Sequence, residues 1–303
     1  GTRWYHRHFT SQYGNGVVGT MVVHGPATAN YDIDLGPYMI TDYYWETADN
    51  LQRGAELVGG GPPDSDNILF RGKNIHPEDP SRGAFDRITL TPGKKHRLRL
   101  INTSVDNSFT ITLVGHTFAV IQIDLVPVQP ITKSQLFMAV GQRYDVIIEA
   151  NQPVDNYWLK ATLESRNFCG ASRNKNPRAI FHYDGAGNGQ PTNAGPTITA
   201  AYAGETGFVP QLVKNVPSSG FSTTDLELDL EQPTVDFRGQ VFRWEINDVD
   251  IEIEWEHPIL EYVYQGRSDW PAKANVIEVP QADKWVYWVI QNNFILPHPI
   301  HLH

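Results

Sequence analysis

The feature that most constrains the fold is a series of short β-branched and apolar runs, evenly spaced and separated by turn residues. Five such runs are rich in Val, Ile, Thr, Tyr or Phe, which favour strands, and they cover residues 87–90, 97–101, 109–114, 118–123 and 144–149. Even spacing of this kind is typical of antiparallel sandwiches. The sequence therefore predicts an all-β chain of Greek-key β-sandwiches, and 303 residues suffice for about two or three domains.

Composition along the chain predicts where these domains begin and end. Residues 184–220 are rich in Gly, Asn, Pro, Thr and Ser, a composition that buries little and predicts a linker. Residues 31–183 before the linker hold one domain's worth of strand-like sequence. Residues 1–27 read as a strand, a turn and a strand, and so predict the last part of a preceding domain. Strand-like runs resume in residues 221–303, which predict the first part of a third domain.

Net charge excludes two classes of partner. The formal net charge is -10 and the pI is about 5.5, so the chain lacks the basic surface that neutralises phosphates of nucleic acid or of anionic membranes. No run of apolar residues reaches the roughly 18 needed to cross a bilayer. We therefore expect neither nucleic acid nor a membrane as a partner.

Histidines at both ends of the chain have the spacing of metal ligands. His6 and His8 are two positions apart on a predicted strand, so their imidazoles project from one face, and His301 and His303 repeat this spacing. Four neutral imidazoles would suit copper or zinc. His298 lies an odd number of positions before the second pair and is followed by a proline, so we expect it to point toward a different metal.

Zinc hydrolysis is the weaker reading of these histidines. The His-x-His pattern of metallo-β-lactamases continues with an Asp and a further His, whereas Phe9, Thr10 and Ser11 follow here. Six other histidines stand singly, without ligand spacing, and are predicted to be structural or exposed: His24, His76, His96, His116, His182 and His257.

Both histidine segments resemble copper motifs of fungal laccases, which are multicopper oxidases. Residues 1–9, Gly-Thr-Arg-Trp-Tyr-His-Arg-His-Phe, resemble the second copper motif, and residues 298–303, His-Pro-Ile-His-Leu-His, resemble the opening of the third. Interior segments such as Val140-Gly-Gln-Arg-Tyr-Asp-Val146 resemble ascomycete laccases. The resemblance covers essentially the whole chain.

The resemblance implies cupredoxin-like domains: the end of the first, the whole second and the start of the third. It also implies one-electron oxidation of phenols at a type 1 copper, coupled to four-electron reduction of dioxygen to water at a trinuclear cluster. A complete enzyme of this kind holds four copper ions. By the resemblance, His6 and His8 each bind one copper of the type 3 pair, His301 binds the type 2 copper, His303 binds the type 3 pair, and His298 binds the type 1 copper.

Other motifs of the family are absent. Laccases carry a His-Trp-His-Gly motif before this region and a His-Cys-His motif after it, so half the cluster ligands are missing and we expect the isolated chain to be an inactive fragment. Cys169, the single cysteine, has no flanking histidines. It resembles a laccase cysteine that forms a disulfide, but the expected partner near residues 202–208 is absent.

Asp124 matches the position of a carboxylate at the floor of the laccase substrate pocket, where a base would take the phenolic proton. The alternative is an Asp that ends a strand and caps the turn before Pro127. Within the same fold, a ferroxidase or an ascorbate oxidase shares the copper motifs, and the laccase-like sequence from Asp124 to Val140 favours laccase. For the isolated chain, a non-catalytic copper- or zinc-binding fragment is the alternative.

The resemblance also implies a secreted, extracellular, monomeric glycoprotein of lignin degradation, with phenols and dioxygen as its partners. Asn102-Thr-Ser104 is the candidate glycosylation site.

Overall fold

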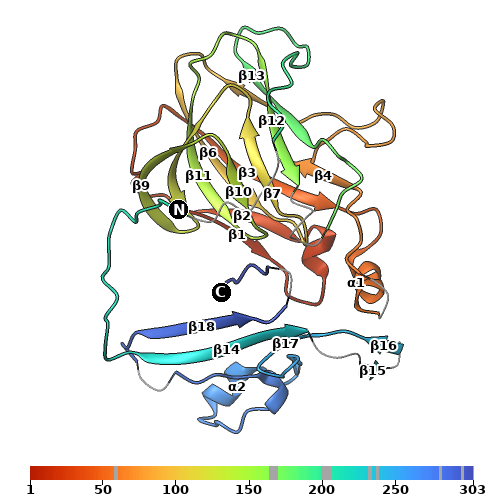
Figure 1. Ribbon diagram of the computed structural model, residues 1–303, viewed down its shortest axis with the longest axis vertical. Coiled ribbons are helices and arrows are strands. Elements are labelled where there is room, and N and C mark those ends of the chain that lie inside the picture. The colour runs from red at the N-terminus through yellow and green to blue at the C-terminus, as the bar shows by residue number, and fades with distance from the viewer. Residues whose placement is uncertain are drawn as a thin grey trace. The chain divides into compact units, whose positions relative to one another are not determined.

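The computed structural model describes residues 1–57, 61–163, 170–198, 206–230, 234–236, 239–279, 282–294 and 297–302 (Figure 1). Strands dominate this part of the chain, and the all-β prediction is confirmed. The chain divides into two compact units, one of residues 1–52, 62–213 and 299–303 and the other of residues 53–61 and 214–298. The domain boundaries at residues 27, 183 and 220 stay predictions.

Two sheets build the sandwich of the first unit. The six-stranded sheet has the order β4-β3-β6-β11-β8-β9, with β3 (Ile33–Tyr43), β4 (Asn67–Phe70), β6 (Lys95–Asn102), β8 (Phe118–Ile123), β9 (Val126–Lys133) and β11 (Arg143–Glu149). The five-stranded sheet has the order β10-β7-β12-β13-β5, with β5 (Arg87–Leu90), β7 (Phe109–Leu113), β10 (Leu136–Met138), β12 (Asn156–Leu163) and β13 (Arg178–Tyr183).

Alternation along β6 explains how this sandwich closes. Leu98 and Leu100 point into the core, where they are fully buried among side chains of both sheets, such as Phe118 of the six-stranded sheet and Phe181 of the five-stranded sheet. Arg97 and Arg99 point to the other face of the same sheet, yet they are only 3% and 2% exposed. The outer face of the six-stranded sheet is therefore covered as well.

An N-terminal hairpin supplies part of that cover. Its strands β1 (Thr2–His6) and β2 (Val18–Val22) are antiparallel, with Thr2 opposite Val22 and His6 opposite Val18. The 3₁₀ helix η1 (Gln12–Asn15) lies between the strands and ends at Gly16, whose φ of 90° is accessible to glycine at little cost. The Thr2 hydroxyl reaches the buried Asp145 of β11, so the hairpin packs on the outer face of the sheet.

The second unit contains a three-stranded sheet in the order β17-β14-β18, in which β14 and β18 are parallel. Its described elements are β14 (Ser222–Leu230), β15 (Thr234–Asp236), β16 (Gly239–Val241), β17 (Trp244–Ile246), α2 (Ile259–Tyr264), η2 (Ala272–Ala274) and β18 (Val286–Asn292). Helix α1 (Ala48–Glu56) follows β3 in the chain. Within the described ranges, no helix combines the length and the apolar character needed to span a bilayer.

The structure contradicts glycosylation at Asn102, the candidate site from the sequence. Asn102 is fully buried, its Nδ2 donates hydrogen bonds to the carbonyl oxygens of Asn107 (3.0 Å) and Met138 (3.2 Å), and its Oδ1 accepts one from the backbone N–H of Ser104 (3.0 Å). A glycan on this amide would break these hydrogen bonds and is incompatible with the fold.

Candidate metal centre

Strand β1 positions the first histidine pair. Because side chains alternate along a strand, Thr2, Trp4 and His6 share the face that packs on the sheet. The His6 ring lies 4.5 Å from the Trp4 ring between centroids. The strand ends at His6, so the prediction that both histidines stand on one strand is wrong for His8. The ring centroid of His8 is nevertheless only 4.7 Å from that of His6. The two imidazoles are close enough to bind adjacent metal ions.

The loop that follows this pair is fixed by Asp49, in the first turn of α1. Its carboxylate accepts hydrogen bonds from the hydroxyls of Thr10 (3.1 Å) and Ser11 (3.0 Å) and from Nδ2 of Asn15 (2.9 Å). Asn15 in turn accepts the backbone N–H of Ala48 at 2.8 Å. The loop of residues 10–15, which follows His6 and His8, is thus attached to the start of α1.

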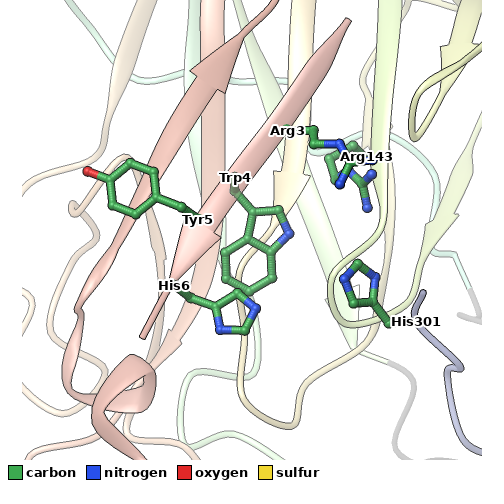
Figure 2. A pocket seen from close by; sticks show the side chains of 6 residues that line it. All are labelled: Arg3, Trp4, Tyr5, His6, Arg143 and His301. Carbon is green, nitrogen blue, oxygen red and sulfur yellow. The ribbon is translucent and has the colours of Figure 1, made fainter. Parts of the chain in front are cut away.

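A cavity of about 160 Å³ opens beside β1 (Figure 2). Its lining side chains are Arg3, Trp4, Tyr5, His6, Arg143 and His301. In Figure 2, Tyr5 points to the opposite side of β1 from Trp4. His6 and His301 therefore line one cavity, although they come from opposite ends of the chain.

Arg143 gives this cavity its charge. Its Nη1 donates to the carbonyl oxygen of Gly141 (2.9 Å) and pairs with Asp124 (3.0 Å), while its buried Nε has no hydrogen-bond partner in the described part of the chain. Burial lowers the pKa of Arg143, the Asp124 carboxylate opposes this shift, and Arg3 adds to it. Two guanidiniums thus line the cavity, and Asp124 balances the charge of one of them.

His298 has different surroundings from His301. It belongs to the second unit, where its half-buried ring packs edge-on against Trp244 at 4.2 Å and lies 6.4 Å from Phe294. His301 belongs to the first unit and lines the cavity. Assignment of these two histidines to separate metals stays a prediction. The predicted ligand His303 and the lone Cys169 lie outside the described residues.

Asp124 occupies the turn between β8 and β9 and adopts a positive φ of 49°. Its Oδ1 accepts the backbone N–H of Arg143 (3.1 Å) as well as the guanidinium, and its own N–H donates to the carbonyl oxygen of Arg143 (2.9 Å). The turn role is therefore observed. Oδ2 has no hydrogen bond in the described chain, and the side chain is 41% exposed, so an acceptor oxygen remains for a substrate.

Five of the six single histidines bind other protein groups. Their partners are Glu78 and Asp79 N–H for His76, Thr91 N–H for His96, Tyr183 and Val114 for His116, Asn156 for His182 and Glu261 for His257. Across the described ranges, no three His, Cys, Asp or Glu side chains form a metal-binding group. His6, His8 and His301 offer imidazole nitrogens, which are suitable donors for copper.

Comparison with known proteins identifies the family. Residues 35–186 match a family model described as multicopper oxidase, and residues 244–303 match a second model of the same description. The chain belongs to the multicopper oxidase family. Copper is therefore the cofactor that its histidines are expected to bind, and the imidazole nitrogens of His6, His8 and His301 fit that ion.

Similar multicopper oxidases include fungal laccases. Over its whole length the chain is 46% identical to a laccase of Cryphonectria parasitica, of which it covers 51%, and 43% identical to Laccase-3 of Botryotinia fuckeliana, of which it covers 69%. The crystal structure of a laccase from Botrytis aclada matches with a TM-score of 0.86 and 34% identity, over 97% of this chain and 54% of that one. The chain spans about half the length of most of these relatives.

Sequence reasoning did not anticipate four of the six residues that line the cavity in this multicopper oxidase chain. Arg143 stands in the motif that carried the resemblance, but nothing in that motif shows that its side chain reaches the histidines. Arg3, Trp4 and Tyr5 directly precede His6 in the sequence. Proximity to a predicted ligand on the same strand was the one signal that could have found them.

Proposed function

We propose that this chain is part of a laccase, to which it contributes ligands of the type 1 copper and of the trinuclear cluster. When bound, copper supplies single-electron transfer from a phenol and four-electron reduction of dioxygen to water. The observation that carries the proposal is that His6 and His301 line one cavity, with the His8 ring beside that of His6. The whole-length similarity to fungal laccases supports it.

In this proposal the histidines have separate roles. His6 and His8 each bind one copper of the type 3 pair, His301 binds the type 2 copper and His303 binds the type 3 pair. His298, against Trp244, binds the type 1 copper. The remaining ligands would come from the other part of a longer protein, since the relatives are about twice as long as this chain.

Phenol oxidation needs an acceptor for the phenolic proton, and Asp124 is the residue that we propose for it. Arg143 fixes Oδ1 through its guanidinium and its backbone N–H, which orients the carboxylate and leaves Oδ2 as the acceptor. We further propose that the enzyme is a secreted monomer that acts on phenols of the kind found in lignin, as its similarity to fungal laccases suggests.

Copper titration of the 303-residue chain tests the metal site. We expect His6→Ala and His301→Ala each to weaken Cu(II) affinity by about tenfold or more, because each removes an imidazole donor, and to change the Cu(II) electron paramagnetic resonance spectrum. His24→Ala is the control, since His24 is exposed and lies away from the cavity lining. If all three variants bound Cu(II) like the wild type, the cavity would not be a copper site.

A further inference from the structure

A buried carboxylate joins β1 to the sheet beneath it. Asp145, 1% exposed, accepts hydrogen bonds from Thr2 Oγ1 (2.5 Å), from Arg97 Nη2 (2.5 Å) and from Arg99 Nη1 (2.9 Å). Asp145 lies directly opposite Arg99 in the pairing of β11 with β6. Arg99 also pairs with Asp34 at 2.6 Å, so two carboxylates balance two guanidiniums.

The Thr2 hydroxyl has two roles in this network. It donates to Asp145 Oδ1 and accepts a hydrogen bond from Arg99 Nη1 at 3.1 Å. A hydroxyl can donate and accept at the same time, whereas a methyl group of the same size can do neither. Because Thr2 is fully buried, loss of its hydroxyl would leave both partners without a replacement from water.

Contacts of β1 with the sheet follow the alternation of the strand. Thr2 reaches Asp145, and two residues later the indole Nε1 of Trp4 donates to the carbonyl oxygen of Gly141 at 3.4 Å. Two residues further along the same face is His6, whose ring lies against that of Trp4. The attachment of Thr2 therefore fixes the register of β1, because a shift of one residue would turn His6 to the other face.

We propose that Thr2 and Asp145 are positioning residues: the buried network fixes the register and orientation of β1, and thereby holds His6 and its neighbour His8 at the cavity that His301 lines. The part of this proposal that concerns copper rests on the proposed function. The part that concerns the strand does not.

The test compares Thr2→Val with Thr20→Val in the 303-residue chain. Thr20 lies in the same hairpin, opposite Trp4, and its hydroxyl makes no hydrogen bond in the described structure, so it is a matched control. We expect Thr2→Val to speed hydrogen exchange of the amides of residues 3–7 by about tenfold or more and to weaken Cu(II) affinity about tenfold. Thr20→Val should change neither, and Thr2→Ser, which keeps the hydroxyl, should behave like the wild type.

Exchange in β12 serves as the internal reference for global folding, since this strand lies in the other sheet of the sandwich. Faster exchange confined to β1 supports the proposal, whereas equal exchange in Thr2→Val and Thr20→Val would overturn it. Copper data separate the two hypotheses. If His6→Ala left Cu(II) binding unchanged while Thr2→Val still released β1, the proposed copper site would be wrong and the positioning of the strand would stand.

Discussion

Two carboxylates of the first unit show how environment decides the chemistry of a residue type. Asp124 is partly exposed, and an arginine holds one of its oxygens. Asp106 lies near Asp42, and its buried Oδ2 has no partner in the described chain. Burial, with a smaller effect of the Asp42 charge, raises the pKa of Asp106 to about 7. A single sequence could suggest the first carboxylate by motif, but not the second, because its neighbour is 64 positions away.

Asp124→Asn keeps the size of the side chain and removes the base. In a longer laccase that contains this chain, turnover of a phenol should fall roughly a hundredfold, because proton acceptance at Oδ2 is lost. Turnover of a non-phenolic one-electron donor should change little. Steady-state rates with the two donors are the measurement. An equal fall with both would mean that Asp124 acts only through the turn that it shares with Arg143.

Asp106→Asn should remove a pH-dependent destabilisation of the folded chain, which arises from burial of the Asp106 carboxylate. The folded-state pKa of Asp106 is about 7, above the ordinary value of 3.8, so the folded chain binds the extra proton between these values. The contribution of this residue to stability therefore falls as pH rises from about 4 to about 7, and the cost is fully present above that range. Near pH 8 we expect the free energy of unfolding of Asp106→Asn to exceed that of the wild type by on the order of 2 kcal/mol, measured by urea denaturation.

The advantage of the Asp106→Asn variant should shrink toward pH 4, where Asp106 is protonated in both states. Asp184→Asn, at an exposed position, is the control and should show no such trend. An advantage of Asp106→Asn that stayed constant with pH would point to packing and not to proton binding.

Individual strands were predictable where alternation and turns agree. Residues 87–90 and 118–123 are strands with the predicted bounds, β5 and β8. Strand β6 illustrates the limit. Its alternation of Arg and Leu is typical of a strand with one solvated face, but that face is buried because β1 covers it through contacts more than ninety residues away in sequence. Covering elements of this kind follow from tertiary packing, which a local pattern does not contain.

Substitutions at the two ends of the segment of residues 298–303 should each disable a different step of the reaction: electron entry at His298 and reoxidation by oxygen at His303. In a longer laccase, His298→Ala should weaken or abolish the blue absorption, because a ligand of the type 1 copper is lost. His303→Ala should keep that absorption, and a phenol should still bleach it, but oxygen should not restore it. Anaerobic bleaching followed by admission of oxygen measures both. Loss of the blue absorption in His303→Ala would contradict the separate assignment.

The 303-residue chain, taken as a whole molecule, should not become intensely blue after copper is added. A blue site needs a cysteine thiolate together with histidines, and the single Cys169 has no histidine near it in sequence. We expect the visible spectrum of the Cu(II)-loaded chain to lack the intense thiolate-to-copper absorption. Cys169→Ser should give the same spectrum. An intense band that disappeared in Cys169→Ser would make this cysteine a copper ligand.

The hydrogen bond between Thr2 and Asp145 joins residues that are far apart in the sequence, and this separation matters while the protein is being synthesised. Thr2 leaves the ribosome 143 residues before Asp145, which at roughly 5–20 residues per second is a delay of about 7–30 seconds. During this interval β1 lacks the buried carboxylate that fixes its register, although β3, β4 and β6 of the same sheet have already been made. The positions of His6 and His8 are therefore set only after β11 has been made.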